Sequence, residues 1–355
     1  MAGKTVLAED RTLSAGLDVD GHGAAVALLD VTTGEVIFEG RLTHDDMTWQ
    51  RFLARLPGCR IAAFYEAGPI GFTLCRRLTA LGVCCRVVAP SQVPKASNLQ
   101  QTKTDRRDAF TLAQLCFHPP RSFVRLPSEE EEARRQWVRL REQLLEDKQR
   151  IMRRIKSLLL NYGLTPPLEA GQAWSRAYRQ WLRDCPLNFE ELRFTLDVML
   201  DELDAIEQQL ERINQRLREL ARHPDYRAAA ERLMKIPGVG PLLAMTFLLE
   251  LFRPAEFASA EALAAHVGLT PCEYSSGGKQ RRGHITHWGP PALRRLLVEA
   301  AWVWSYKDQH AQLRFRTIRA GKSPKIAIVG MARRLAVAMW AMTVRQEEYA
   351  YRWRA

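Results

Sequence analysis

Apolar and polar residues follow patterns along the first third of the chain that predict an α/β unit. Residues 13–18, 24–31 and 35–42 form three short apolar or alternating runs, separated by glycine-containing turns. This pattern is typical of three antiparallel strands joined by tight turns. The residues that follow predict, in order, a helix at 45–56, a strand at 59–65, a helix at 69–81, a strand at 83–89 and a helix at 105–116.

This order of elements is that of the ribonuclease H plan, in which the first strand lies beside the fourth and the last helix passes over them. Asp18 and Glu66 stand at the ends of those two strands, and Asp105 and Asp108 lie three residues apart on the last helix. Four carboxylates could then meet on one divalent ion, Mg²⁺ or Mn²⁺, which prefers oxygen ligands. Asp20 is an alternative ligand on the same strand face. An acid pair with this spacing is, by itself, typical of a solvated helix face.

Beyond a linker rich in proline and arginine at 118–127, the pattern predicts helices. A long helix begins after Ser128, which forms a capping box with Glu131. From residue 188 a four-three alternation of apolar residues predicts a coiled-coil seam, whose partner is either that first long helix or another subunit. Residues 236–240, Ile-Pro-Gly-Val-Gly, have the form of a helix-hairpin-helix turn that contacts phosphate, or of a simple turn between core helices. The seam consists of Leu192, Leu196, Met199, Leu203, Ile206, Leu210, Ile213, Leu217 and Leu220.

The composition favours a polyanionic partner. The chain has 52 Lys and Arg residues against 40 Asp and Glu, a net charge of +12. No uninterrupted apolar run approaches the roughly 18 residues that a membrane helix needs, and the N-terminal segment lacks a signal-peptide core. Seven cysteines without a CxxC pair fit a reducing compartment. We therefore expect a soluble, cytoplasmic protein with no membrane partner.

A polar, cationic stretch at 268–286 is expected to be a flexible loop. Ser275 and Ser276 stand there before two glycines, and three cationic residues follow them: Lys279, Arg281 and Arg282. A serine hydroxyl attacks phosphorus only with the help of a base, a metal or a cationic surrounding, and these side chains supply the last of these. By itself the Ser-Ser-Gly-Gly sequence is that of an ordinary loop.

Several stretches resemble the DEDD-type insertion-sequence transposases, relatives of the RuvC resolvase and the Piv invertase that include the bridge-RNA-guided recombinases. The resemblance covers nearly the whole chain in the same order and spacing. It departs at residues 287–288, His-Trp, where the family commonly carries basic residues. The matching stretches are 16–20 (GLDVD), 65–68 (YEAG), 88–91 (VAPS), 103–109 (KTDRRDA), 268–286, 293–302 (LRRLLVEAAW) and 325–335 (KIAIVGMARRL).

The resemblance implies a RuvC-like (ribonuclease H-like) catalytic domain at 1–122, a helical coiled-coil region at 123–225 and a helical C-terminal transposase domain at 226–355. It implies that the four acids form a metal-binding tetrad, and that Ser276, with Ser275 as the near alternative, becomes covalently joined to DNA. It also implies an element-encoded bridge RNA, a homo-oligomer (dimer or tetramer) and a place in the prokaryotic cytosol at the nucleoid. The expected nucleic-acid-binding residues are Lys103, Arg106, Arg107, Lys279, Arg281 and Arg282.

Two other functions stay open at this point. A hydrolytic junction-resolving nuclease would use the same tetrad with water as the nucleophile, and would keep its cleavage after Ser276→Ala. A non-catalytic nucleic-acid-binding protein would bind equally well after Asp105→Ala and would break no strand with any metal.

Overall fold

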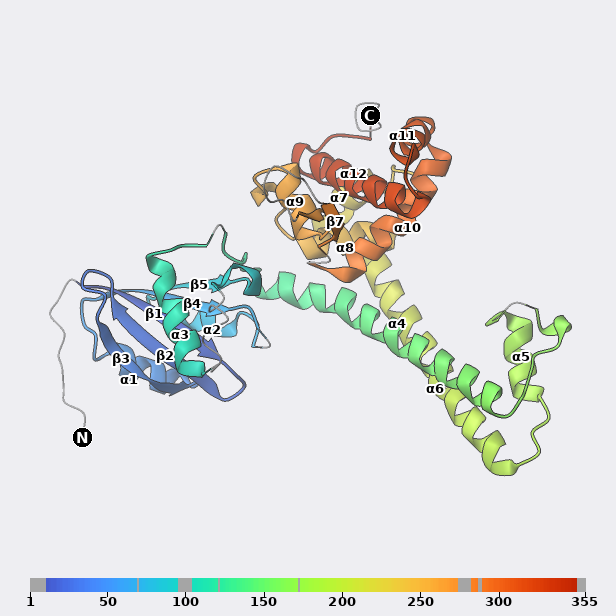
Figure 1. Cartoon of the computed structure of the whole chain (residues 1–355), viewed down its shortest axis with the longest axis horizontal. Coiled ribbons are helices and arrows are strands. Elements are labelled where there is room, and N and C mark those ends of the chain that lie inside the picture. The colour runs from blue at the N-terminus through green and yellow to red at the C-terminus, as the bar shows by residue number, and fades with distance from the viewer. Residues whose placement is uncertain are drawn as a thin grey trace. The chain divides into compact units, whose positions relative to one another are not determined.

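A computed structural model of the chain describes residues 11–68, 70–94, 104–120, 122–171, 173–273, 282–286 and 289–349. The chain divides into two compact units, residues 1–126 and 127–355. The first is a five-stranded sheet with helices on both faces, and the second consists mostly of helices (Figure 1). This confirms the predicted mixed α/β unit followed by helices, whereas the division into three domains stays a prediction.

The sheet of the first unit has the strand order β3-β2-β1-β4-β5. The first three strands are antiparallel neighbours, β4 lies parallel beside β1, and β5 lies parallel beside β4. The predicted antiparallel strands and the predicted adjacency of the first and fourth strands are therefore confirmed. The strands are β1 (Thr12–Val19), β2 (Gly23–Asp30), β3 (Val36–Thr43), β4 (Arg60–Glu66) and β5 (Cys84–Val88).

Alternate residues of each strand point to opposite faces of the sheet and pack against different helices. Leu13 and Leu17 of β1 pack with Trp49 of α1 on one face. Ala27 of β2 packs with Ala109 of α3 on the other, which we call the α3 face (Figure 1). The helices of this unit are α1 (Asp46–Leu53), α2 (Thr73–Ala80) and α3 (Asp105–Ala113), with short 3-10 turns at Pro90–Gln92 and Gln114–Cys116.

Helix α3 approaches β1 more closely than any side chain at Gly16 would allow. A Cβ atom at Gly16 would lie 1.9 Å from the carbonyl oxygen of Ala109 and 2.2 Å from the backbone nitrogen of Ala113. The buried hydroxyl of Ser14 donates a hydrogen bond to the carbonyl oxygen of Ala113 at 2.6 Å. The contacts at Ser14 and Gly16 therefore fix both the distance and the direction of α3 along β1.

Two long helices, α4 and α6, lie side by side in the second unit (Figure 1). Leu196 and Leu203 of the predicted seam are buried in one cluster with Ile151 of α4. The first long helix is thus the partner of the seam within this chain, while the supercoil of a true coiled coil stays a prediction. The helices are α4 (Glu129–Asn161), α5 (Arg176–Asp184) and α6 (Glu190–Leu220), with a 3-10 turn at Leu168–Ala170.

Helix α4 begins with the predicted capping box. The Ser128 hydroxyl oxygen accepts a hydrogen bond from the backbone amide of Glu131 at 3.1 Å, and the Glu131 carboxylate accepts one from the backbone amide of Ser128 at 2.7 Å. Four glutamates occupy the first turn, where the helix dipole favours negative charge. The start of the long helix is therefore set by its own sequence.

A carboxylate on α6 connects all three helices of this region. Glu207 receives two hydrogen bonds of 2.6 Å from Arg179 of α5, and the ammonium group of Lys148 on α4 lies 2.7 Å from it. The hydrogen bonds from Arg179, followed by those from Lys148, lower the pKa of Glu207 from 4.5 to about 2. The pairing therefore stabilises the fold fully above pH 4.5, and this stabilisation is lost as the pH falls from 4.5 to about 2.

Glu207→Gln is expected to lower the free energy of unfolding at pH 7 by about 1–2 kcal/mol, because the amide cannot replace a carboxylate held by two cations. The difference from the wild-type protein should shrink as the pH approaches about 2, where the wild-type carboxyl group is protonated. Urea unfolding at several pH values measures this. Glu211→Gln, on the same helix but in an exposed pair with Arg218, is the matched control and should change the free energy by less than about 0.5 kcal/mol.

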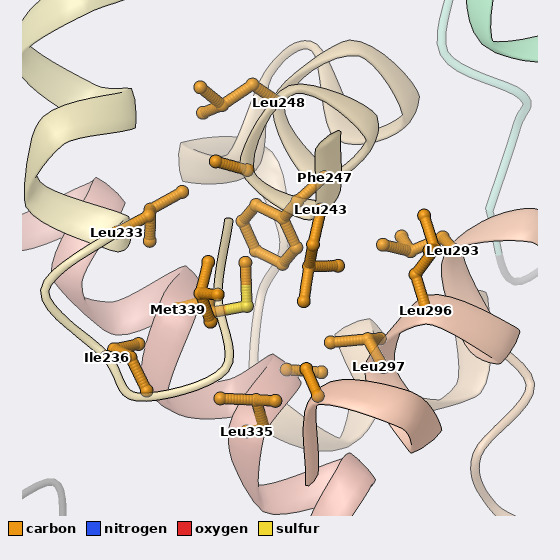
Figure 2. Close-up of a cluster of buried hydrophobic side chains, with 14 of the residues drawn as sticks. Leu233, Ile236, Leu243, Phe247, Leu248, Leu293, Leu296, Leu297, Leu335 and Met339 are labelled. Carbon is orange, nitrogen blue, oxygen red and sulfur yellow. The ribbon is translucent and has the colours of Figure 1, made fainter. Parts of the chain in front are cut away.

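The core of the C-terminal helices gathers apolar side chains from distant segments. Leu233 of α7, Phe247 of α8 and Met339 of α12 point toward one another (Figure 2). The same cluster includes Val138 of α4 and Leu217 of α6, so the base of the helix pair belongs to this core. The helices are α7 (Pro224–Leu233), α8 (Pro241–Leu251), α9 (Ala260–His266), α10 (Pro291–Lys307), α11 (Gln309–Arg319) and α12 (Pro324–Arg345), with a 3-10 turn at Pro254–Glu256.

The turn between α7 and α8 is anchored by the buried side chains of Ile236 and Val239. Gly238 has a φ of 92°, and a Cβ atom there would lie 2.7 Å from the carbonyl oxygen of Ala300 in α10. Backbone conformation and packing both require a glycine at this position. The helix-hairpin-helix role of the turn in phosphate contact stays a prediction.

Helix α12 is, among the described residues, the one helix long and apolar enough to cross a membrane by length and composition. Of its apolar window, 56% is buried inside the protein. Ile328, Met331 and Leu335 of this helix are fully or almost fully buried in the C-terminal core. Burial of this kind is typical of the central helix of a folded core.

The prediction of a loop throughout 268–286 was wrong at its two ends. Strands β6 (Pro271–Glu273) and β7 (Arg282–Ile285) pair there as an antiparallel ribbon. Strands of three and four residues are too short to show an alternating pattern, and each finds its partner across the intervening segment. That segment, residues 274–281, lies outside the described residues.

Candidate active site

Asp18 and Glu66 stand at neighbouring strand ends. In the parallel pair of β1 with β4, each acid directly follows the last paired residue of its strand. Gly16 and Phe64, two residues earlier, both contact the region of α3. Because residues two apart on a strand share a face, both acids lie on the α3 face. Asp18 is partly buried and Glu66 is exposed.

Helix α3 supplies the other two predicted acids. Its last turn lies over Ser14 and its middle over Gly16, so it runs antiparallel to β1. Its first turn carries Asp105 and Asp108 and therefore lies toward the strand end that holds Asp18. Asp105 is exposed and Asp108 is partly buried. The structure thus places the four predicted acids at one edge of the sheet, from β1, β4 and α3.

Arg41 of β3 lies among these acids. It is opposite Ala25 of β2, which is in turn opposite Asp18 of β1, so the three residues share one level and one face of the sheet. The Arg41 guanidinium pairs with the carboxylate of Asp20 and lies 3.9 Å from that of Asp105. The hydrogen bond with Asp20, followed by the charges of Asp20, Asp105 and Asp18, raises the pKa of Arg41.

Asp20, the alternative metal ligand, is engaged by the turn that follows β1. One carboxylate oxygen accepts hydrogen bonds from the backbone amides of His22 at 2.8 Å and Gly23 at 3.0 Å. The other oxygen accepts a hydrogen bond from Arg41. These bonds, with that from Arg41 the largest, hold the pKa of Asp20 well below its usual range. Asp20 therefore holds Arg41 in place.

The residues fit a divalent ion in the kind of donor they offer. Asp18, Glu66, Asp105 and Asp108 present hard carboxylate oxygens, the ligands that Mg²⁺ and Mn²⁺ prefer. Their edge of the sheet already attracts a cation, the Arg41 guanidinium. Within the part of the chain that the structure describes, no three His, Cys, Asp or Glu side chains lie close enough together to hold a metal ion. The gathering of the tetrad around one ion therefore stays a prediction.

Three of the predicted nucleic-acid-binding residues lie in the part of the chain that the structure describes. Arg106 of α3 forms an ion pair with Glu39 of β3, and Arg107 is exposed in the same turn. Arg282 lies in β7. The remaining site residues of the sequence analysis lie outside the described residues: Lys103, Ser275, Ser276, Lys279 and Arg281.

Arg41 and Glu39 were missed by the sequence analysis. Because residues two apart on a strand share a face, the sequence can place Glu39 and Arg41 together on one face of β3. It cannot place them at the level of the acids, because a β-bulge between Leu28 and Leu29 shifts the register of β2 against β3 by one residue. The alternation of polar residues in β3 predicts only a strand.

Comparison with known protein families matches both units of the chain. Residues 15–163 match a family described as a transposase, the DEDD type of IS110. Residues 230–316 match the transposase IS116/IS110/IS902 family. The chain belongs to this transposase family. Together the two matches cover more than half of the chain, and the first contains the acids at 18, 66, 105 and 108 in the order Asp-Glu-Asp-Asp.

Individual relatives agree with this assignment over nearly the full chain. The y4qE protein of Sinorhizobium fredii is 28% identical over 96% of this chain and 91% of its own length. The transposase for insertion sequence element IS1533 of Leptospira borgpetersenii is 29% identical over 90% of this chain and 92% of its own. The transposase for element IS1328 of Yersinia enterocolitica is 25% identical, over 87% and 90%.

The protein is accordingly a DNA transposase of the IS110 type, and its first unit carries the RuvC-like DEDD domain. A domain of this type indicates dependence on a divalent metal in general. Membership also implies that the protein binds DNA.

Proposed function

We propose that this transposase cuts and rejoins DNA strands through a covalent bond between Ser276 and a DNA phosphate, with Asp18, Glu66, Asp105 and Asp108 as the metal-binding tetrad. The observation that carries the proposal is the placement of these acids. Two of the acids stand at the ends of neighbouring parallel strands, and the other two lie in the first turn of α3, toward the same edge of the sheet. Mg²⁺ or Mn²⁺ suits a ligand set made only of carboxylates.

The reaction follows from the residues of the chain. The Ser276 hydroxyl oxygen attacks the phosphorus; the new Oγ–P bond forms as the bond from phosphorus to a deoxyribose oxygen breaks. The hydroxyl proton passes to a nearby base, and the leaving oxygen takes up a proton. A bound divalent ion would neutralise the phosphate and stabilise the leaving oxygen. Lys279, Arg281 and Arg282 hold the phosphodiester beside the serine.

The phosphoserine ester conserves the energy of the broken phosphodiester. A deoxyribose hydroxyl of another strand can therefore displace Ser276 and restore a phosphodiester without a nucleotide cofactor. Attack by the wrong acceptor, water, would release the strand and end the exchange. We expect Ser276 to meet the tetrad within a homo-oligomer, a dimer or a tetramer. The serine and the acids of one site then come from the same subunit or from different subunits.

We also propose that an element-encoded bridge RNA selects the target. The net charge of +12 favours contact with nucleic-acid backbones; Arg106 and Arg107 lie in the helix that carries two of the acids, and Lys103 comes two positions before that helix in the sequence. Guide pairing then reads the target sequence while the protein reads backbone and shape. Such a reaction takes place in the prokaryotic cytosol, at the nucleoid.

A denaturing gel with end-labelled element ends, the flanking transcript and Mg²⁺ tests the proposal. The wild-type protein is expected to form a protein-DNA adduct that survives denaturation, and Ser276→Ala is expected to form none. Ser275→Ala, the neighbouring serine with the same change in size, should keep the adduct. Continued cleavage by Ser276→Ala without an adduct in either protein would show a hydrolytic nuclease instead. Loss of the adduct only in Ser275→Ala would assign the nucleophile to that residue.

A further inference from the structure

Two ion pairs of opposite polarity connect β3 with the first turn of α3. Arg41 of the strand lies 3.9 Å from Asp105 of the helix, and Glu39 of the strand pairs with Arg106 of the helix. Glu39 and Arg41 are two residues apart and so share the α3 face. The turn of α3 that carries a predicted metal ligand is thus bound to a strand that contributes no acid to the tetrad.

Two interactions fix the position of Arg41: the pairing of β3 with β2 fixes its backbone, and the ion pair with Asp20 fixes its guanidinium. Its register opposite Ala25 places it two strands from Asp18 at the same level. Asp20 is itself held by the backbone amides of His22 and Gly23. A guanidinium held in this way presents a positive charge to Asp105 and lies in the field of Asp18.

This arrangement gives the acids a counter-ion. Carboxylates gathered at one edge repel one another when no cation lies between them. Arg41 supplies one positive charge, and it does so at an exposed acid of the group, Asp105. A divalent ion that binds Asp105 together with Asp18 must work against the repulsion of a guanidinium a few ångströms away, since both cations compete for the same carboxylate.

We propose that Arg41 is the counter-ion of the metal-free acids and has to leave Asp105 before a divalent ion can bind. This inference rests on the metal site of the proposed function. Asp20 keeps the arginine on β3 when it leaves Asp105, because the pair between Arg41 and Asp20 does not involve the tetrad. The chain thus carries its own competitor of the metal, Arg41, on the edge strand β3.

The opposite role for Arg41 would be that of a purely structural tie that holds Asp105 ready for the metal. The two roles predict opposite signs. If Arg41 competes with the metal, its removal leaves Asp105 without a counter-ion and strengthens metal binding. If it only holds the helix turn in place, its removal loosens that turn and weakens metal binding.

The test is an isothermal titration calorimetry experiment in which the full chain, wild type or Arg41→Gln, is titrated with MnCl₂ alone. We expect Arg41→Gln to bind Mn²⁺ about fivefold more tightly, the effect of one unit charge at about 4 Å in a solvated site. Its melting temperature in EDTA should be lower than that of the wild-type protein, and the rise in melting temperature on adding Mn²⁺ should be larger. Arg41→Lys, which keeps the charge, should bind Mn²⁺ within about twofold of wild type.

Arg60→Gln is the matched control, because it removes the same charge at the other end of β4, opposite Thr12. It should change neither Mn²⁺ affinity nor the response to EDTA. Unchanged or weaker Mn²⁺ binding by Arg41→Gln, with a circular dichroism spectrum like that of wild type, would overturn the proposal while leaving the metal site standing. If neither protein binds Mn²⁺ and Asp18→Asn alters nothing, the metal site itself is absent and the proposal fails with it.

Discussion

Asp105→Asn is expected to lower DNA strand cleavage by at least about 100-fold while nucleic-acid binding persists. Asparagine keeps the size of the side chain but removes the negative charge that a divalent ion requires. Replacing residues that merely orient metal ligands already costs about 10- to 100-fold in affinity or activity, so loss of a direct ligand should cost no less. Binding should persist because it rests on the excess of basic residues rather than on the acids.

Cleavage of end-labelled element DNA under single-turnover conditions measures this effect, and a gel-shift titration measures binding. Asp46→Asn is the matched control: Asp46 is exposed in the first turn of α1, as Asp105 is in that of α3, but α1 packs on the opposite face of the sheet and Asp46 pairs there with Arg77 at 3.5 Å. Its cleavage rate should stay close to wild type. Cleavage by Asp105→Asn within a few-fold of wild type would remove Asp105 from the tetrad.

Gly16→Val is expected to destabilise the first unit by about 3 kcal/mol or more. The first added carbon would lie 1.9 Å from the carbonyl oxygen of Ala109, a backbone atom of a packed helix that cannot move aside as a flexible side chain can. Overpacking of a buried site costs about 1–3 kcal/mol even when side chains can adjust. Here α3 must shift as a whole, and its first turn, with Asp105 and Asp108, shifts with it.

Urea unfolding gives the loss of stability, and hydrogen exchange followed by mass spectrometry shows where it occurs. Backbone amides of residues 105–113 should exchange faster in Gly16→Val than in the wild-type protein. Gly21→Ala, in the turn after the same strand, adds a carbon that meets nothing within 4 Å and should stay within about 0.5 kcal/mol of wild type. Equal stability of Gly16→Val and wild type would contradict the close packing of α3 on β1.

The elements of the first unit could be predicted because each one is encoded locally. The apolar runs before Asp18 and Glu66 predicted their strands, the glycine turns predicted the antiparallel order of the first three strands, and the plan of the unit then put the two acids at neighbouring strand ends. Ser128 and Glu131 likewise predicted the start of α4 from residues only three apart. Interactions over short sequence distances therefore account for what was foreseen.

Contacts between residues far apart in the sequence account for what was missed. Arg41 is 64 positions from Asp105, and no local pattern marks their approach. The ribbon of β6 and β7 depends on pairing across a segment, and each strand alone is too short to be recognised. The partner of the seam on α6 is not predictable from the sequence for the same reason, since the spacing of leucines shows that a partner exists but not which helix it is.

The shared apolar cluster at the base of α4 and α6 has a practical consequence for dissecting this transposase. Val138 and Leu217 are 2% and 1% exposed and lie in the same cluster as Leu233 and Phe247. A fragment that began at residue 226 would lose the first two and uncover the apolar surface they protect, which favours aggregation. Roles of the helix pair and of the serine-bearing region are therefore better separated by point substitutions in the intact polypeptide than by cutting it.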